Sequence, residues 1–540
     1  MVTAVYGALT VLLTYPLPFK AGTTLIGSDP DIDLFMWTLA WDTHAFIHHP
    51  LSIFDANIYY PFRHTLAYSE NLIGSAVFAA PVLWVTQNPV LALNAVTLVS
   101  LVLCALGGYV LGRRLGLSHA GAFICGLVYA FAPARFFRLS QLHLTAVQWI
   151  PFTLAFLHGY LDRGRRRDLW LALAFFSLQA ITSGHGAVYC LMAVAGLVAY
   201  RFAFVDAFDL RRRIRDAGIA GVLLLAPAAL IIVPYRTVQI EMGLRRPLGD
   251  QAPTPESFLA SPTHLQTFLL SFFPDAHVME RASGILFPGI LTVLLALIAF
   301  VPERPTVRPP LGAGSLDRWH LRIYYGVLTL LSVLLATGAL WPYVYWLPGM
   351  NFIRVPSRFM ILAMMGLAVL AAIGFDRVRA AVRPGWQRPL AFTMSALLIA
   401  ESAAIPFTGV PYEVSLPAAD RWLNGQPKPF VVAEVPVVLL DRYQTTYMLH
   451  AMAHWQKTVH GYSGMRPALH ETLYRQLQRF PDDESLERLM ELNVTYVVVH
   501  ADQYHEPGEW PAVDERLDRY ASRLSLVYKD RTARVYSLRR

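Results

Sequence analysis

Long apolar runs recur along most of the chain, and they constrain its fold more than any other feature. About eleven runs are long enough to cross the ~30 Å hydrocarbon core of a bilayer. They occupy residues 2–18, 89–111, 119–132, 146–161, 168–183, 186–204, 217–234, 285–301, 322–340, 357–375 and 389–407. With 55% hydrophobic and 15% charged residues among 540, the chain is too apolar for an ordinary soluble protein. We expect a mainly α-helical, polytopic membrane bundle of about eleven spans.

Two apolar segments need separate treatment. The run at 72–85 is shorter and contains Pro81, so it is either a re-entrant or interfacial helix or a further span. The first run has no basic segment before it and no small-residue cleavage site after it. We therefore interpret it as a retained first helix and not as a signal peptide.

Arginines between the runs indicate the orientation of the chain. They cluster at Arg113 and Arg114 and within 163–167, 211–215, 304–322 and 377–388, which are alternate loops. Because Arg and Lys concentrate on the cytoplasmic side, we place these loops and the N-terminus there. The net charge of +8 then reflects topology, and its scattered distribution does not favour a nucleic-acid partner.

The opposite side receives the long loops and the C-terminal tail. The loops at 19–88, 235–284 and 341–358 and the segment after 408 are rich in Asp, His, Tyr, Trp and Pro, which indicates that recognition or chemistry occurs there. We expect a multi-pass protein of the inner (plasma) membrane with an extracytoplasmic active site. The predicted domains are a membrane domain, 1–410, including outer loop 19–88, and an extracytoplasmic soluble α/β domain, 411–540.

The composition of the last 130 or so residues is that of a soluble domain. The segments "PFVVAEVPVV" and "VTYVVVH" predict buried strands, and "LSLVYKD" with "ARVYSL" predicts a hairpin. Helices are expected at "PALHETLYRQLQRF" and "DDESLERLMEL", the second with acidic residues in its first turn.

Three carboxylates lie close together just after the first apolar run. Asp29, Asp31 and Asp33 fall within five residues of the segment "GSDPDIDLFMWTLAWDTHAF". Such a group is solvated, binds a cation, or shares a proton with a substrate. The sequence leaves two interpretations open, an acidic loop with a helix cap or a site with a general base and a metal ligand.

The same loop carries groups suited to binding a sugar. Trp37, Trp41 and His44 share one face of a predicted helix, an arrangement that an interfacial helix also favours. Further along, hydrogen-bonding and stacking groups gather at Asn57, Tyr59, Tyr60, Tyr68, Ser69, Glu70 and Asn71. Among these residues, His44, Tyr59, Tyr60 and Glu70, together with Asp33, are candidates for substrate binding.

Cationic and proton-active groups occur at distant helix ends on the outer side. They are Arg135, Arg138, His143, His185, Arg354 and Arg358. Positive charge on this side runs against the topology rule and needs a cause. A lipid phosphate or diphosphate held bidentately by Arg is one cause. Snorkelling of interfacial Arg side chains is the alternative.

The soluble domain contains histidines at helical spacing but no recognised motif. His450 and His454 lie at i and i+4, a spacing that can bind zinc, but no HExxH-type carboxylate stands beside them, so we do not predict a metal there. Ser463 lacks the context of a catalytic nucleophile. The absence of a Walker motif and of a dinucleotide fingerprint argues against ATP and nicotinamide cofactors.

The acidic motif Asp29-Pro30-Asp31 in a long first outer loop, about eleven spans, and a C-terminal soluble domain together resemble the fold-C superfamily of membrane glycosyltransferases. The resemblance implies a polyprenyl-phosphate sugar donor and a glycan, lipid or protein acceptor. It also implies that Asp29 or Asp31 deprotonates the acceptor hydroxyl, with inversion at the anomeric carbon. These carboxylates could hold a divalent cation, Mg²⁺ or Mn²⁺, which some members use and others do not.

Two other functional classes fit parts of the pattern. A transporter or flippase of a lipid-linked saccharide would bind with the same groups, but it would favour internal repeats and ionisable residues at mid-membrane. A non-catalytic assembly protein would use the soluble domain to recruit partners. The transferase interpretation requires the aspartates of the first loop and the outer arginines to act on one substrate.

Overall fold

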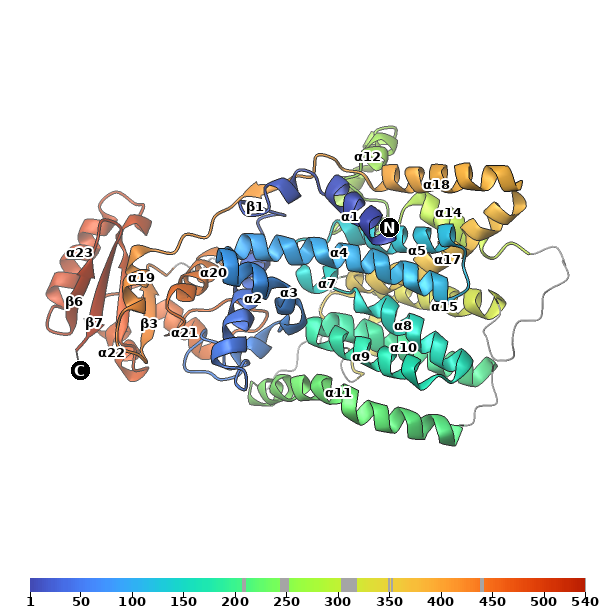
Figure 1. Ribbon diagram of the computed structural model, residues 1–540. Helices are drawn as coiled ribbons and strands as arrows, with labels where there is room; N and C mark the ends of the chain where they lie inside the picture. Colours follow the sequence, from blue (N-terminus) through green and yellow to red (C-terminus); the bar gives the residue numbers. More distant parts are fainter. Residues whose placement is uncertain are drawn as a thin grey trace. The chain divides into compact units, whose positions relative to one another are not determined.

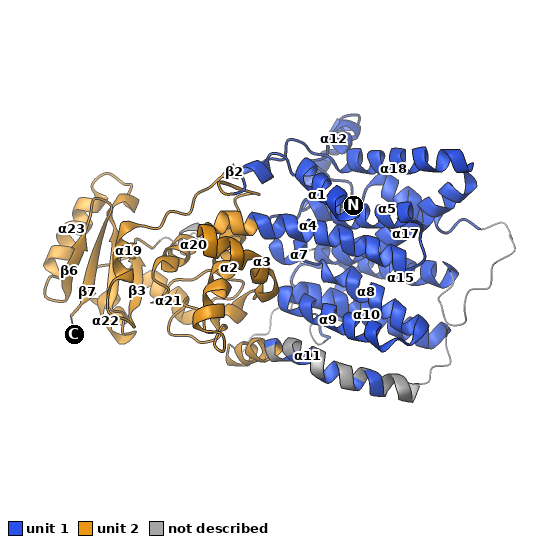
Figure 2. Ribbon diagram, in the orientation of Figure 1, with its two compact units in different colours: residues 1–21, 94–231, 245–409 blue, residues 22–93, 232–244, 410–540 orange. Residues whose placement is uncertain are grey.

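The computed structural model describes residues 1–205, 210–242, 252–302, 318–347, 350, 353–437 and 441–539. These divide into two compact units (Figure 2). Unit 1 comprises residues 1–21, 94–231 and 245–409, and unit 2 comprises residues 22–93, 232–244 and 410–540. The first outer loop and the C-terminal segment, far apart in the sequence, therefore belong to the same unit.

Unit 1 is helical (Figure 1). Its longer helices are α1 (Val2–Leu13), α4 (Pro89–Arg114, which begins in unit 2), α5 (His119–Phe131), α8 (Trp149–Arg163), α9 (Arg166–Thr182), α10 (Gly184–Phe204), α11 (Leu210–Glu241, which ends in unit 2), α14 (Ile290–Ile298), α15 (Arg318–Ala336), α17 (Met360–Ala381) and α18 (Gln387–Ser402). Short helices lie between them: α6 (Pro133–Phe136), α7 (Leu142–Thr145), α12 (His264–Leu270), α13 (Val278–Arg281) and α16 (Trp341–Val344).

Several of these helices are long and apolar enough to cross a membrane. Within the described residues there are four, Pro89–Arg114, Gly184–Phe204, Arg318–Ala336 and Pro356–Ala381. Shorter apolar helices are Val2–Leu13, Ile73–Thr86 and His119–Phe131. The chain is accordingly a membrane protein, and the figure of about eleven spans stays a prediction.

Helix α17 is the core helix of unit 1. It packs against α5, α14 and α15, and 94% of its most apolar window is buried. Two glycines allow the close approach: a Cβ on Gly374 would lie 1.8 Å from the Leu295 carbonyl oxygen, and one on Gly366 would lie 2.2 Å from Thr329 Oγ1. Small residues at helix crossings are typical of packing in membranes, where backbones meet closely.

Unit 2 contains a five-stranded sheet in the order β4-β3-β5-β7-β6. Strands β4 (Lys457–Thr458), β3 (Val431–Val435) and β5 (Tyr496–His500) are parallel, while β7 (Ala533–Leu538) pairs antiparallel with β5 and with β6 (Leu524–Lys529). The sheet is accompanied by helices α19 (Ala418–Asn424), α20 (Asp441–His450), α21 (Ala468–Leu477), α22 (Asp483–Glu491) and α23 (Glu509–Arg519). The predicted strands, hairpin and two helices of this segment are confirmed.

The first outer loop supplies the rest of unit 2. It contains α2 (Pro30–His48), the 3-10 turn η2 (Thr65–Tyr68) and α3 (Ile73–Thr86), and β1 (Thr24–Leu25) pairs antiparallel with β2 (Val410–Pro411). Helix α3 corresponds to the run with Pro81 and has 14 residues. A straight span needs about 20 residues, so α3 belongs with the shorter apolar helices.

Backbone hydrogen bonds join this loop to the end of the sheet. The Thr458 N–H donates to the Asn57 carbonyl over 2.8 Å, and Tyr59 and Tyr60 donate to the His460 and Thr458 carbonyls over 2.9 and 3.0 Å. The next residue, Gly461, packs directly on the Tyr59 ring, since a Cβ there would lie 2.7 Å from two ring carbons. The loop thus extends the sheet beyond β4, and any larger residue at 461 would separate the two segments.

Candidate functional site

The start of helix α2 fixes the three aspartates of the acidic motif. Asp29 is the N-cap, and its Oδ1 accepts the Asp31 N–H over 2.9 Å. Pro30 occupies the first helical position, and Asp31 and Asp33 fall in the first turn. Each choice suits a helix N-terminus, because a capping oxygen, a proline with no N–H to satisfy, and negative charge near the positive end of the helix dipole are all stabilising.

Side chains from the C-terminal segment hold two of these carboxylates. The Tyr462 hydroxyl donates to Asp31 Oδ1 over 3.0 Å. The Tyr412 hydroxyl and Thr445 Oγ1 donate to the two oxygens of Asp33, each over 2.7 Å. The acidic helix start is therefore built into unit 2 through hydroxyl groups, which supply hydrogen bonds but no opposing charge.

The three carboxylates consequently differ in what they can do. Asp29 is exposed and caps the helix, and Asp33 is buried with a hydroxyl donor on each oxygen. Asp31 is half-buried and is oriented by Tyr462. A general base must be oriented and also within reach of substrate, so Asp31 combines these two properties best. Asp33 fits the role of a group that fixes α2 against the C-terminal segment.

A fourth carboxylate of α2 was not singled out from the sequence. Asp42 is fully buried, and neither oxygen has a hydrogen-bond partner among the described residues. Burial raises its pKa well above the usual value, so this group is protonated at neutral pH. A neutral carboxylic acid is a weak base, and Asp42 does not compete with Asp31 for that role.

The far end of α2 carries an aromatic stack. The His44 ring lies 4.2 Å from the His48 ring and 4.4 Å from the Trp455 ring, nearly parallel to both. Burial, together with His48 and His49, lowers the pKa of His44 to about 4, so the ring is neutral at pH 7. Trp41 belongs to the same stack and donates from Nε1 to the Ile53 carbonyl.

The other sugar-binding candidates of the loop lie inside unit 2. Tyr59 is 1% exposed and Glu70 is 5% exposed, while Tyr60 packs against the sheet core. Tyr59 stacks edge-on with His470 of α21. These side chains hold the loop onto the C-terminal segment, and any part they have in substrate binding stays a prediction.

A cluster of cationic and imidazole side chains forms separately within unit 1. Arg358, in the turn Pro356–Phe359, donates from Nη1 to His185 Nε2 over 2.9 Å, and the His185 and His143 ring centroids are 4.9 Å apart. Arg138 reaches Ser357 Oγ and Gln141 Oε1 only over 3.5 and 3.4 Å. We call Arg138, Arg358, His143 and His185 the arginine cluster.

Arg138 lacks the anionic partner that a partly buried guanidinium normally has. No carboxylate pairs with it among the described residues, and its Nε has no hydrogen-bond partner there. Burial lowers its pKa to about 10, and the nearby positive charge of Arg358 contributes to this effect. Two guanidinium groups held close without a counter-ion are an arrangement that a phosphate group would stabilise.

The remaining predicted arginines have different surroundings. Arg135 is 2% exposed, and its guanidinium donates to the carbonyls of Tyr129, Ala130 and Thr145. Arg354 is exposed. The structure thus brings together Arg138, Arg358, His143 and His185, and it places Arg135 in the interior and Arg354 at the surface.

Groups with the character of metal ligands occur elsewhere in unit 2. Glu434, His450 and His500 each offer a ligand atom within 4.8 Å of the others, and all three are buried. The sequence argument dismissed His450 because it considered only carboxylates adjacent in the chain. Glu434 in fact lies 16 residues before His450, on β3.

The tyrosines and threonine that hold the aspartates were also missed from the sequence. Tyr412, Thr445 and Tyr462 lie 379, 412 and 431 residues from their carboxylate partners. No local spacing encodes such contacts. The segment "HGYSGM" was considered only for Ser463, whose hydroxyl donates to the Met465 carbonyl and supports the turn that presents Tyr462.

We expect unit 2 to lose stability on acidification through His470. This residue is 4% exposed, and burial, with His460 and Arg466, lowers its pKa from 6.5 to about 3. Below pH 6.5 the unfolded chain therefore binds a proton that the folded chain does not, so stability falls as the pH decreases toward 3. Between pH 7.5 and 5 this amounts to about 2 kcal/mol. Thermal unfolding at both pH values checks it: a His470→Gln variant should lose part of the pH dependence, and an unchanged dependence contradicts the assignment.

Comparisons with known proteins were made for sequence and fold. No protein-family model and no curated protein sequence matches the chain. Among solved structures, the chain is similar to the Archaeoglobus fulgidus oligosaccharyltransferase in complex with Zn and sulfate, at 14% identity over 100% of this chain and 73% of that chain, with a TM-score of 0.47.

Two further structures are similar at the same level. The oligosaccharyltransferase AglB from Archaeoglobus fulgidus, in complex with an inhibitory peptide and a dolichol-phosphate, has 13% identity over 93% of this chain and 69% of that chain, with a TM-score of 0.45. ArnT from Cupriavidus metallidurans, in the apo state, has 14% identity over 99% and 97%, with a TM-score of 0.41. Both proteins are glycosyltransferases of the fold-C superfamily, the superfamily that the sequence resembles.

Proposed function

We propose that the chain is a membrane glycosyltransferase that moves a sugar from a polyprenyl-phosphate donor to an acceptor hydroxyl on the outer face of the membrane. The observation that carries the proposal is the start of α2, where Asp31 is oriented by Tyr462 while Asp29 and Asp33 have other tasks. A chain that only recruited partners would not require a carboxylate held in this way.

In the proposed reaction, Asp31 is the general base. The acceptor O–H gives its proton to the Asp31 carboxylate, and the acceptor oxygen forms a bond to the anomeric carbon. The bond between that carbon and the phosphate oxygen breaks, and polyprenyl phosphate leaves with the bonding electron pair. Attack opposite the leaving group inverts the anomeric configuration. General-base assistance of this kind contributes about 10²–10⁴-fold to a rate.

The arginine cluster supplies the second role. As the glycosidic bond breaks, negative charge grows on the phosphate oxygens. Arg138, which has no carboxylate partner among the described residues, and Arg358, oriented by His185, would stabilise that charge. Donors already in place cost no rearrangement during the reaction, which makes this term large in enzymes.

The test measures chemistry and transport in the same vesicles. Purified protein is reconstituted with a polyprenyl-phosphate sugar labelled in both the sugar and the phosphate, together with a membrane extract that provides acceptors. The proposal expects acceptor-dependent release of polyprenyl phosphate and a labelled product of inverted configuration. Nucleotide sugars serve as the control donor.

Three results would overturn the proposal. Transfer from a nucleotide sugar with no use of the lipid donor would assign a different donor class. Movement of intact donor across the bilayer without release of polyprenyl phosphate would identify a transporter. A product that retains the anomeric configuration would remove Asp31 as the base of a single displacement, because retention needs a second displacement step.

A further inference from the structure

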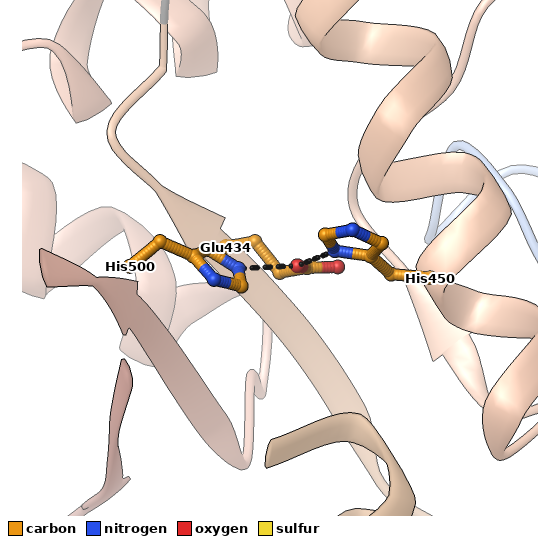
Figure 3. A group of neighbouring side chains, drawn as sticks. All are labelled: Glu434, His450 and His500. Atoms are coloured by element: carbon orange, nitrogen blue, oxygen red, sulfur yellow. Dashed lines mark hydrogen bonds and ion pairs between the residues drawn. The ribbon is translucent and has the colours of Figure 1, made fainter. Parts of the chain in front are cut away.

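A buried group of histidines and carboxylates lies at the carboxyl ends of two parallel strands in unit 2. Figure 3 shows Glu434 between His450 and His500. Glu434 Oε2 is 2.8 Å from His450 Nδ1 and 2.7 Å from His500 Nε2. The three residues come from β3, α20 and β5.

The register of the sheet explains why these side chains meet. Glu434 on β3 pairs with Val498 on β5, and His500 lies two residues beyond Val498 at the end of that strand. Because side chains alternate between faces, Glu434 and His500 point to the same face of the sheet. The carboxyl ends of parallel strands, where connections lead away in opposite directions, are the usual position of ligand sites in such sheets.

A second carboxylate enlarges the group. Asp420 of α19 is fully buried, its Oδ2 lies 3.9 Å from His450 Nδ1, and its Oδ1 lies 3.8 Å from His454 Nε2. Neither Asp420 oxygen has a hydrogen-bond partner among the described residues, and the same holds for Glu434 Oε1 and His454 Nε2. Four unpartnered polar atoms in one buried cluster are unusual, since buried polar groups are nearly always satisfied.

The charges favour a divalent cation over other occupants. Two carboxylates buried together repel each other and lose their hydration, which costs several kcal/mol unless a positive charge balances them. One divalent ion neutralises both, and neutral imidazoles can then act as ligands. Histidine nitrogen combined with carboxylate oxygen is a donor set typical of zinc, whereas Mg²⁺ and Ca²⁺ take oxygen ligands.

We propose that Glu434, His450 and His500 bind a zinc ion, with Asp420 as the fourth ligand and His454 hydrogen-bonded to Asp420 behind it. Ligand atoms around tetrahedral zinc, at about 2.0–2.2 Å from the metal, stand roughly 3.3–3.6 Å apart. The three shared atoms already lie within 4.8 Å of one another, so shifts below about 1 Å suffice. A donor behind a ligating carboxylate is the usual outer partner of such sites.

The expected role of the metal is structural. The four ligands come from α19, β3, α20 and β5, so the ion joins segments that are separated in the sequence. Helix α20 also carries Thr445, which donates to Asp33 at the start of α2. Zinc would thereby fix the helix that positions the acidic motif, without itself contacting the Asp31 carboxylate.

The experiment measures metal content independently of any transferase assay. The full-length protein is purified through a tag without histidine and without chelators, and its zinc is quantified by mass spectrometry. We expect about one zinc per chain. Removal with a strong chelator should lower the melting temperature, and Zn²⁺, but not Mg²⁺, should restore it.

Variants then locate the ion. Glu434→Gln and His500→Gln should each lower zinc affinity by more than the roughly 10–100-fold that loss of an outer partner causes. His470→Gln removes a buried histidine of the same unit outside the cluster and should leave the metal content unchanged. Full zinc content in Glu434→Gln and His500→Gln would overturn the proposal, as would a wild-type protein that neither contains nor takes up zinc.

If the two variants fail to fold, the wild-type protein still decides the question. Co²⁺ added to the metal-free chain should give the intense visible absorption of a tetrahedral site, and Zn²⁺ should abolish it. A weak octahedral spectrum, or none, would overturn the site. Failure here would leave the transferase proposal untouched, since that rests on Asp31 and on donor use.

Discussion

Replacing Asp31 by Asn is expected to reduce the rate of sugar transfer by about 10²–10⁴-fold while the protein stays folded. Asn retains the shape of the side chain and can still accept a hydrogen bond from Tyr462. What it loses is the ability to take a proton, so kcat should fall much more than donor affinity. The measurement is single-turnover release of polyprenyl phosphate, accompanied by a melting curve.

Two matched variants of the same motif give this prediction its controls. Asp29→Ser preserves an N-cap oxygen for the Asp31 N–H and should retain most activity. Asp33→Asn cannot accept from both Tyr412 and Thr445 and should lower stability more than it lowers kcat. Loss of activity in Asp29→Ser with full activity in Asp31→Asn would transfer the role to Asp29. Full activity in both would remove the carboxylate base.

The second large effect is expected at the arginine cluster. Arg138→Ala and Arg358→Ala should each reduce transfer by about 10²–10³-fold, because each removes a donor to the charge that grows on the leaving phosphate. Arg138→Lys keeps the charge but loses the bidentate geometry, so it should fall between wild type and Ala. Arg281→Ala, an exposed arginine of unit 1, is the control.

A further measurement separates leaving-group stabilisation from simple folding defects. The Arg138→Ala variant should bind polyprenyl phosphate more weakly than wild type in a direct binding assay, whereas its melting temperature should change little. Unchanged affinity for the lipid phosphate together with unchanged transfer would show that Arg138 and Arg358 serve the packing of unit 1 alone.

Local patterns were sufficient to predict most elements of unit 2. The apolar strand at β3, the hairpin of β6 and β7, and helix α22 with its acidic first turn all follow from hydrophobic periodicity and capping residues. The helix that starts at Asp29-Pro30 likewise follows from an N-cap residue and a proline at the first position. Such features are encoded within a few residues of one another.

The partners of the acidic motif could not be predicted in that way. Asp31 and Tyr462 are 431 residues apart, and their contact depends on how the first loop and the C-terminal segment fold together as unit 2. The buried histidine cluster was missed for a similar reason. Its one sequence signal was Glu434, a carboxylate inside the otherwise apolar strand "VVAEV", where a buried charge requires a partner.

The central claim is that the first outer loop and the C-terminal segment form one catalytic unit in which Tyr462 acts through Asp31. A double-mutant cycle on kcat tests it most directly, with Tyr462→Phe, Asp31→Asn and the double variant. Tyr462→Phe alone should lower kcat by about 5–20-fold, equivalent to loss of one hydrogen bond to a charged group. In the Asp31→Asn background it should cause no further loss. If the two effects instead multiply in full, Tyr462 and Asp31 act independently and the account is wrong.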